Sequence, residues 1–414
     1  MQDNEKKPAL RFKGFTDPWE QRKLGEIAVF SKGVGYSKND LCEEGTPIIL
    51  YGRLYTKYET CIFDVDTFVK EKAGSVYSKG GEVIVPASGE TAEDISIASV
   101  VVKPGILLGG DLNIVSPTAE YDSAFLALTI SSGATHKYLS SLAQGKSVVH
   151  LHNADIQSVS AKFPTKREQE KIHLLFGKID TLITLHQRKY EKLVNIKKSM
   201  LDKMFPQNGV SVPEIRFKGF TDPWEQRKLG EICDFITKGA TPTTYGFSWQ
   251  PDGVPFFRND SIKDNVFVFG EFSYISEAAN EVLKRSEVHG NDILIAITGD
   301  IGKVGIIPDT VEKANINQHI ARVRIRKEAL PYFVYQYLAS DDTQKEYQKI
   351  KTGLSMPQLS LEQVRDIVVK IPEFNEQGKI ADCLRRIDTL ITLHQRKLEK
   401  LQNIKKSCLE KMFV

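Results

Sequence analysis

One stretch of this chain occurs twice without a single change. Residues 11–27 read RFKGFTDPWEQRKLGEI, and residues 216–232 repeat all 17 residues. A second identical pair, IDTLITLHQRK, occupies residues 179–189 and 387–397. The offsets of 205 and 208 residues are close to half of the 414-residue chain, far longer than the roughly 20–50-residue period of a solenoid repeat. The sequence therefore predicts two related domains in tandem.

The sequence between the identical segments has diverged but keeps a common skeleton. Residues 80–90 read GGEVIVPASGE and residues 290–300 read GNDILIAITGD, so glycines and apolar positions persist while polar residues change. The same relation joins GTPII at residues 45–49 to GVPFF at residues 253–257. We therefore expect one fold present twice, with two different surfaces.

The composition is typical of a globular chain. Apolar residues make up 41% and charged residues 26% of the sequence. No run approaches the ~18 apolar residues of a membrane helix, and no apolar stretch follows Lys6 and Lys7 as in a secretory signal. The five cysteines are scattered and contain no C-x-x-C pair, which favours free thiols. We expect a cytoplasmic protein with no membrane contact and no metal site.

The small net charge of +3 is distributed unevenly. Residues 164–205 hold 10 basic against 5 acidic residues, and residues 372–413 hold 9 against 6. The intervening regions are mildly acidic, with 11 against 15 in residues 28–163 and 16 against 18 in residues 233–371. Because bulk charge is low, any DNA contact must come from local patches or be completed by a partner.

Two long helices are predicted after Pro164 and Pro372. Apolar residues recur there at heptad spacing, and about 37 residues at 1.5 Å each give a rod of roughly 55 Å. Each helix alone would leave its apolar stripe in water, so we expect the two to pair, and packing of each on its own domain is the alternative. The seam positions are Ile172, Ile179, His186 and Leu193 in the first helix and Ile380, Ile387, His394 and Leu401 in the second, and the stripe also includes Leu182, Ile196, Leu390 and Ile404.

An antiparallel pair suits the chain path, because a globular domain separates the two helices. Alignment of His186 with His394 at the midpoint places Asp180 opposite Lys400 and Lys192 opposite Asp388, which are complementary charges. This is the register that we predict. The two histidines are interpreted as polar seam residues that set the register, with ligand roles as the alternative.

Short alternating runs and amphipathic stretches fill the regions between the helices. Strands are expected at residues 82–85, 95–102, 292–297 and 321–325, and short helices at residues 123–130 and 331–339. The predicted domain order is residues 1–163, a helix at 164–208, a second domain at 209–371 and a second helix at 372–414. Trp19 and Trp224, in the identical segments, are expected in the core, with subunit docking as the alternative.

No catalytic constellation is found. Gly145-Lys146-Ser147 resembles the end of a phosphate-binding loop, but Ser140 replaces the required first glycine and Leu354 replaces the lysine in the repeat. Gly33-x-Gly35 lacks a third glycine, and no H-E-x-x-H, G-x-S-x-G or Asn/Asp-Pro-Pro-aromatic sequence occurs. Glu90 and Asp300 hold equivalent places in the two repeats, where loop capping or base reading is favoured over acid catalysis. We therefore expect no catalytic residues.

These residues together resemble the specificity subunit of type I restriction–modification systems. The resemblance covers essentially the whole chain and is carried by the doubled FKGFTDPWEQRKLGEI and IDTLITLHQRK, by the GEVIVPASGE and NDILIAITGD segments, and by NINQHI. It implies an α+β fold class, in which two homologous α+β target-recognition domains alternate with two long antiparallel coiled-coil helices in a pseudo-two-fold internal repeat.

The resemblance also implies partners and cofactors. Each target-recognition domain would read one half of a split double-stranded DNA sequence, and the helices would fix the gap between the halves. Two modification subunits, which methylate adenine with S-adenosylmethionine, and two restriction subunits, which use ATP and Mg²⁺, would join the chain. This chain itself would hold no cofactor.

Base-reading residues are expected on loops, since Arg, Lys, Asn, Gln, Ser, Thr and acidic side chains recognise base edges. Gly89 and Gly299 are expected to shape turns. The candidates in the first domain are Tyr36, Tyr51, Arg53, Ser88, Glu90, Thr91, Lys146 and His150, and those in the second are Lys238, Thr243, Arg258, Asn259, Thr298, Asp300, Lys303, Asn317, Gln318, His319 and Gln358.

Three alternatives stay open at this point. The first is a non-catalytic scaffold that binds two protein partners without DNA. The second is the specificity part of a related methyltransferase or nuclease system. The third, a fused restriction–modification enzyme, is disfavoured by the missing catalytic motifs and the short chain.

Overall fold

The chain divides into two compact units, each containing half of each long helix. The computed structural model describes residues 8–413 except 146, 208, 271 and 354–355. Unit 1 comprises residues 1–187 and 395–414, and unit 2 comprises residues 188–394. Both division points fall inside the long helices, which are α7 (Lys166–Met204) and α12 (Phe374–Met412).

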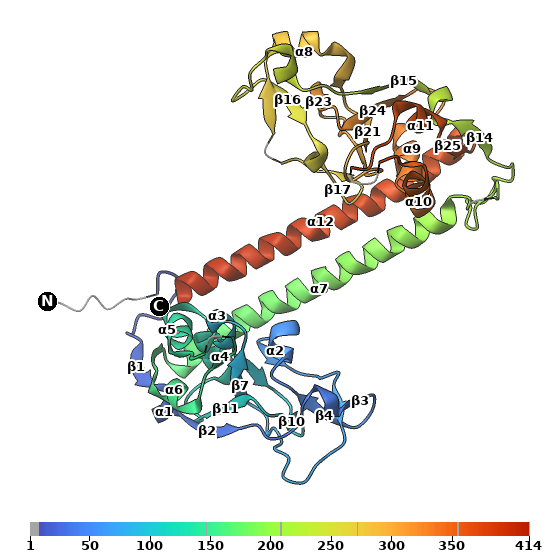
Figure 1. The fold of residues 1–414 in the computed structure, drawn as a ribbon. Helices are drawn as coiled ribbons and strands as arrows, with labels where there is room; N and C mark the ends of the chain where they lie inside the picture. The colour runs from blue at the N-terminus through green and yellow to red at the C-terminus, as the bar shows by residue number, and fades with distance from the viewer. Residues whose placement is uncertain (1–7, 146, 208, 271, 354–355, 414) are drawn as a thin grey trace. The chain divides into compact units, whose positions relative to one another are not determined.

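Unit 1 is an α+β domain (Figure 1). Its elements are β1 (Glu20–Lys23), α1 (Leu24–Ile27), β2 (Ala28–Lys32), η1 (Lys38–Asp40), β3 (Leu41–Cys42), β4 (Thr46–Ile49), α2 (Arg53–Thr56), β5 (Cys61–Ile62), β6 (Phe68–Val69), β7 (Glu82–Pro86), β8 (Ser88–Gly89), α3 (Ala92–Ile95), β9 (Ser99–Val101), β10 (Leu107–Leu108), β11 (Leu112–Pro117), α4 (Ser123–Ile130), α5 (Gly133–Leu142), β12 (Val149–His150), α6 (Asn153–Ser158) and β13 (Ser160–Phe163). A five-stranded sheet has the order β2-β11-β7-β9-β5 and a four-stranded sheet the order β10-β4-β6-β3. Two further pairs, β1-β13 and β12-β8, are antiparallel.

Unit 2 repeats this plan. Its elements are β14 (Glu225–Lys228), η2 (Leu229–Glu231), β15 (Cys233–Lys238), η3 (Pro242–Tyr245), β16 (Val254–Phe257), η4 (Asn259–Ser261), β17 (Ile262–Lys263), β18 (Val266–Phe267), β19 (Ser273–Ile275), α8 (Glu277–Val282), η5 (Lys284–Ser286), β20 (Glu287–Val288), β21 (Ile293–Ala296), β22 (Val304–Ile306), β23 (Ala314–Ile316), β24 (Ile320–Ile325), α9 (Pro331–Leu338), α10 (Asp341–Ile350), α11 (Leu361–Asp366) and β25 (Val368–Ile371). The four-stranded sheets have the orders β15-β24-β21-β22 and β19-β16-β23-β20. The antiparallel pair β14-β25 corresponds to β1-β13, and the parallel pair β16-β23 corresponds to β4-β10.

The elements that the sequence predicted are present, although they are only a part of those observed. The expected helices at 123–130 and 331–339 are α4 and α9, and three expected strands are β7, β21 and β24. The fourth, expected at 95–102, is shorter, because Thr91 caps α3 through the Asp94 N–H and β9 begins only at Ser99.

The identical segments anchor each unit to the start of a long helix. Arg11 Nε and Nη2 donate to Glu168 at 2.7 and 2.8 Å, and Arg216 makes the same two bonds to Glu376. Both glutamates are fully buried in the first turn of α7 or α12, where the positive end of the helix dipole favours a carboxylate. The repeat therefore fixes the same bidentate ion pair in both units.

Aromatic packing closes the cores around the far ends of the same helices. In unit 1, Phe413 at the end of α12 packs on Phe125 of α4 and Phe176 of α7. In unit 2, Phe205 directly after α7 packs on Trp224 and Phe333. Trp224 is 3% exposed, so its expected core position is confirmed, and Trp19 is half-buried with its ring edge-on to Phe125.

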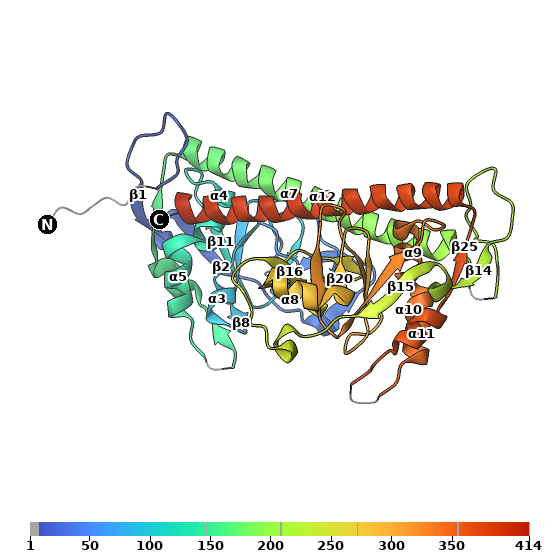
Figure 2. The same ribbon diagram turned by 90° about the horizontal axis from the view of Figure 1, so that it is seen from above.

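The two helices pair in opposite directions within each unit, as expected, but in a different register (Figures 1 and 2). Asp180 Oδ1 lies 2.6 Å from Lys405 Nζ in unit 1, and Lys197 Nζ lies 2.8 Å from Asp388 Oδ1 in unit 2. The predicted partners Lys400 and Lys192 were wrong by five residues, and both lysines are exposed. Each helix has a second lysine five positions further along, so the sequence alone was compatible with either register. In the observed register, Phe413 and Phe205 also pack into the cores of the two units.

The seam itself is narrower than the heptad pattern suggested. The predicted seam isoleucines Ile172, Ile179, Ile380 and Ile387 are at most 8% exposed, and His186, Leu193, His394 and Leu401 are half-buried. The other stripe residues do not lie in it: Leu182 and Leu390 are both 43% exposed, Ile196 36% and Ile404 40%. The heptad pattern could not predict this exposure, because the spacing of an apolar residue does not show whether a neighbouring helix covers it.

All five cysteines are free. Within the described residues, none of the helices is long and apolar enough to cross a lipid bilayer.

The observed register predicts charge-swap rescue. Asp180→Lys or Lys405→Asp alone should lower the free energy of unfolding by about 1–2 kcal/mol, because each leaves a like-charged, partly buried pair. The double variant should recover most of this loss in thermal unfolding of the full chain. The combination of Asp180→Lys with Lys400→Asp is the matched control, and rescue by that pair would restore the heptad-derived register.

A histidine found only in unit 1 predicts a pH dependence. His173 Nδ1 on α7 lies 3.0 Å from Asp122 Oδ2 at the start of α4, and the hydrogen bond with Asp122 raises the pKa of His173. The stability that this pair contributes to the folded protein is fully present below the unfolded pKa of His173, about 6.5. It is lost as the pH rises through the higher pKa of the folded state. Ala381 holds the equivalent place in unit 2.

His173→Ala should therefore reduce the loss of stability measured between about pH 6 and pH 8 by chemical denaturation. His152→Ala, at an exposed position in the same unit, is the control. An unchanged pH profile in His173→Ala would show that the pair contributes nothing to folding.

Candidate nucleic-acid interface

The tail of one central strand forms the core of the candidate site in each unit. In unit 1, Ser88 and Gly89 of β8 follow β7 and pair with β12, so that Ser88 lies opposite His150. In unit 2, Thr298 follows β21 and forms a bridge with Gln358. The exposed acid comes two residues later in both units, as Glu90 and Asp300. The structure therefore builds both sites on one backbone plan.

A side chain from a second segment reaches the same backbone carbonyl in each unit. Tyr55 Oη donates to Ser88 O at 2.8 Å in unit 1, and Asn259 Nδ2 donates to Thr298 O at 2.9 Å in unit 2. Both donors lie just after the strand that pairs in parallel with β10 or β23. This carbonyl bond fixes the second segment beside the acid-bearing tail.

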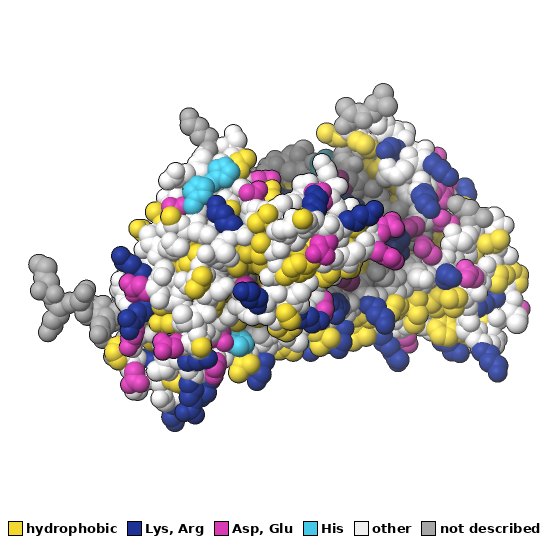
Figure 3. Space-filling model, turned by 90° about the horizontal axis from the view of Figure 1, so that it is seen from below, with side chains coloured by type: hydrophobic (Ala, Val, Ile, Leu, Met, Phe, Trp, Pro, Cys, Tyr) yellow, Lys and Arg dark blue, Asp and Glu magenta, His cyan; other side chains and the backbone are white. Residues whose placement is uncertain are grey.

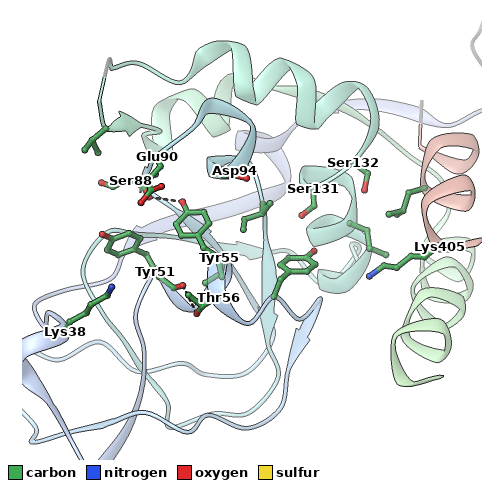
Figure 4. Close-up of a pocket in the computed structure, with 18 residues that line it drawn as sticks. Lys38, Tyr51, Tyr55, Thr56, Ser88, Glu90, Asp94, Ser131, Ser132 and Lys405 are labelled. Carbon is green, nitrogen blue, oxygen red and sulfur yellow. Dashed lines mark hydrogen bonds between the residues drawn. The ribbon is translucent and has the colours of Figure 1, made fainter. Parts of the chain in front are cut away.

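In unit 1 Tyr55 and the strand tail formed by Ser88, Gly89 and Glu90 line a cavity of about 710 Å³. Figure 4 shows Tyr51, Tyr55, Ser88 and Glu90 gathered at one end and Lys405 at the other. Burial and the nearby Asp94 raise the pKa of Tyr55, so its hydroxyl remains a neutral donor. Tyr51 and Tyr55 stand edge to face with ring centroids 6.3 Å apart. The cavity thus combines aromatic faces with hydroxyl and carboxylate groups.

A second cavity of about 910 Å³ shares the wall formed by Lys38, Tyr51, Gly52 and Thr56. Tyr36 lines it with a positive φ of 56°, a conformation that side chains rarely adopt. Its hydroxyl accepts from Lys72 N and lies 2.6 Å from Ser75 Oγ, which holds the ring in place. Tyr51 therefore stands on a ridge between two hollows.

In unit 2 the hairpin that joins β21 to β22 presents the polar groups. Asp300 and Lys303 form an exposed ion pair at 2.7 Å. Two glycines with positive φ shape this turn: Gly299, with φ of 77°, directly precedes Asp300, and Gly302, with φ of 81°, directly precedes Lys303. Ile297 N donates to His319 O, and Asn317 Oδ1 accepts from His319 N at 3.2 Å, which brings the 317–319 loop alongside. The predicted residues of this unit thus converge from four separate segments.

Several predicted residues have internal partners. Arg53 is 8% exposed, and its guanidinium donates to Asp66, Glu59 and a backbone carbonyl, which places it inside the domain. The Thr91 hydroxyl caps α3. Gly89 serves packing rather than a turn, since an added Cβ would lie 2.9 Å from Tyr55 Oη.

The remaining predicted residues lie at the margins. Lys238 and Thr243 are exposed on β15 and η3, and Gln318 accepts from Thr241. Arg258 is exposed, with its guanidinium 4.8 Å from the centre of the Trp249 ring. Lys146 lies outside the described residues. For all of the exposed candidates, DNA contact stays a prediction.

Sequence reasoning missed Tyr55, Lys38 and Trp249. Tyr51 and Tyr55 stand four residues apart, a helical spacing that could have indicated a joint surface. Trp249 gave no signal, because its stacking partner Arg258 becomes a neighbour only through the fold. The face drawn in Figure 3 mixes Lys and Arg with Asp and Glu, in keeping with local patches rather than one basic field.

The architecture, two copies of one α+β unit joined by long antiparallel helices, defines the class, and comparison with known proteins gives the family. The family profile described as "Type I restriction modification DNA specificity domain" matches residues 16–195 and 221–403. The chain belongs to this family and contains two target-recognition domains.

Relatives and solved structures agree with this assignment. The MjaVIII specificity subunit of Methanocaldococcus jannaschii is 23% identical over 401 residues, covering 94% of this chain and 91% of the relative. The EcoBI specificity subunit of Escherichia coli is 25% identical over 304 residues, covering 67% and 63%. The crystal structure of the type I S subunit from M. genitalium has the same fold, with a TM-score of 0.63, 15% identity and 99% of both chains covered.

Proposed function

We propose that this chain selects the DNA target of a type I restriction–modification complex, with each unit reading one half of a bipartite, asymmetric sequence. One observation carries the proposal: the two sites share a backbone plan but present different side chains. Ser88, Glu90 and His150 stand in unit 1 where Thr298, Asp300 and Gln358 stand in unit 2. Since different donors and acceptors select different bases, the two half-sites should differ.

The same proposal assigns the helices to the spacer and to subunit docking. Leu182 and Leu185 are 43% and 45% exposed in unit 1, and their identical counterparts Leu390 and Leu393 are 43% and 44% exposed in unit 2. Identical apolar residues that are equally exposed in both units suit two copies of one partner. We assign them to two modification subunits, with restriction subunits joining in the cytoplasm.

Chemistry then resides on the partners. The modification subunits would bind S-adenosylmethionine and methylate adenine, and the restriction subunits would use ATP and Mg²⁺. The side chains at the two sites on this chain donate, accept and stack. These interactions recognise DNA and need no cofactor.

Genome-wide mapping of N6-methyladenine tests the proposal. Cells that express the chain with a cognate modification subunit should methylate one split, asymmetric motif, once on each strand. Cells with the modification subunit alone should lack that motif. If the modification subunit binds the chain and no chain-dependent motif is found, the protein-scaffold alternative replaces the proposal.

The two acids provide a paired test of half-site reading. A carboxylate only accepts hydrogen bonds, whereas an amide also donates, so Glu90→Gln should change preference at one base pair by about tenfold or more. The change should be confined to one half-site, and Asp300→Asn should affect only the other.

Glu93→Gln, an exposed change three residues further along, is the matched control and should leave the motif unchanged. Loss of both half-sites together in Glu90→Gln would indicate misfolding, which thermal unfolding would detect. An unchanged motif in both acid variants would remove Glu90 and Asp300 from the reading surface.

A further inference from the structure

In each unit an ion pair joins α7 to α12, and the aspartate of that pair also accepts a hydrogen bond from the diverged domain. We define the seam ion pair as Asp180–Lys405 in unit 1 and Lys197–Asp388 in unit 2. All four side chains are between 16% and 28% exposed, so solvent screens them only partly.

In unit 1 the domain contacts the pair through the loop between α2 and β5. Thr60, which is 8% exposed, donates its hydroxyl to Asp180 Oδ2 at 3.1 Å. Lys405 Nζ also lies 5.9 Å from the centre of the Tyr58 ring in the same loop. Because α2 precedes this loop directly, the Asp180 bond holds one end of the segment that carries Tyr51 and Tyr55.

In unit 2 the domain contacts the pair through helix α9. Tyr332 Oη donates to Asp388 Oδ2 at 2.6 Å, and Gln336 Nε2 donates to the same oxygen at 2.8 Å. Gln336 is fully buried and its Oε1 has no hydrogen-bond partner in the described part of the chain, so the bond from its Nε2 to the carboxylate helps to orient the amide. Tyr335, one helical turn after Tyr332, donates its hydroxyl to Asn265 O at 2.6 Å. This bond links α9 to the segment that follows η4 and Asn259.

The two units reach the same aspartate by different routes. Asp180 and Asp388 lie in the identical IDTLITLHQRK, and Lys197 and Lys405 lie in an NIKKS sequence that is also identical in both helices. Unit 1 has Ala124 and Leu128 where α9 has Tyr332 and Gln336, so α4 cannot supply the bonds and Thr60 does so instead. The charge pair is constant, and each variable domain has its own way of bonding to it.

We infer that the seam ion pair positions each recognition domain on its helices, and that Thr60, Tyr332 and Gln336 are the positioning residues. This inference rests on the proposed function, because the quantity that it fixes is the spacing between half-sites. Loss of the bond frees a domain to tilt on its helices while the base-reading side chains stay intact. The preferred spacer should then broaden without a change in either half-site.

Two near-isosteric variants test the inference in the full chain expressed with its modification subunit. Thr60→Val and Tyr332→Phe each remove a hydrogen bond to the seam aspartate and keep the side-chain volume. Methylation is measured on plasmids that carry both half-sites with spacers of every length near the native one. Each variant should raise methylation at spacers one base pair longer or shorter by about fivefold relative to the native spacer.

The chain offers two matched controls. Thr129→Val removes a buried hydrogen bond of α4 to the Phe125 carbonyl of its own helix, a bond that includes no member of the seam ion pair. Tyr347→Phe removes a fully buried hydroxyl that has no partner among the described residues. Both controls should keep the native spacer preference.

Hydrogen exchange of the full chain gives a second readout that does not need DNA. Thr60→Val should raise exchange in residues 56–62 and leave α9 unchanged, and Tyr332→Phe should do the reverse. A spacer preference that stays fixed while exchange rises would overturn the inference, because the bond would then serve only local stability. A changed half-site would also overturn it.

If the wild-type chain directs no methylation, the proposed function fails, and exchange alone decides whether these bonds hold the domains. Increased exchange confined to the altered unit would support the holding role. Unchanged hydrogen exchange in both Thr60→Val and Tyr332→Phe would show that these bonds do not hold the domains on the helices.

Discussion

The fold depends on a buried ion pair that occurs once in each unit, Arg11–Glu168 and Arg216–Glu376. Each glutamate is fully buried in the first turn of a long helix, where an unpaired carboxylate would be strongly destabilising. Two parallel hydrogen bonds from one arginine satisfy it and tie the identical segment to that helix. A neighbouring lysine adds a second repeated contact, since Lys171 lies over Phe15 and Lys379 lies over Phe220.

This anchor explains why the identical segments remain identical while the regions between them vary. The arginine must match the glutamate at the start of a long helix, and the β1 or β14 strand must match β13 or β25. The tryptophan must fit against Phe125 in unit 1 and against Phe205 and Phe333 in unit 2. The intervening domain has only to present a compatible β-sheet core and, at one point, a donor for the seam aspartate. Thr60 meets that requirement in one unit, and Tyr332 with Gln336 meets it in the other.

The sequence predicted the features that depend on periodicity and repetition. The duplicated segments, the two long helices, α4, α9 and the strand tails that end in Glu90 and Asp300 follow from pattern alone. The sequence did not predict which of several equivalent residues makes a given contact. Lys400 and Lys405 are the same residue type on one helix, and only packing in three dimensions selects Lys405 as the partner of Asp180.

Burial of polar groups set a similar limit on predicting the candidate site. Arg53 has the residue type and loop position of a base reader, yet two acids that lie 6 and 13 residues further along draw it into the domain. Tyr55 looks like an ordinary helical tyrosine, yet its bond to Ser88 O places it at the centre of the cavity wall. A side chain can read DNA only if the fold leaves its polar atoms accessible, and that depends on neighbours that no local sequence pattern contains.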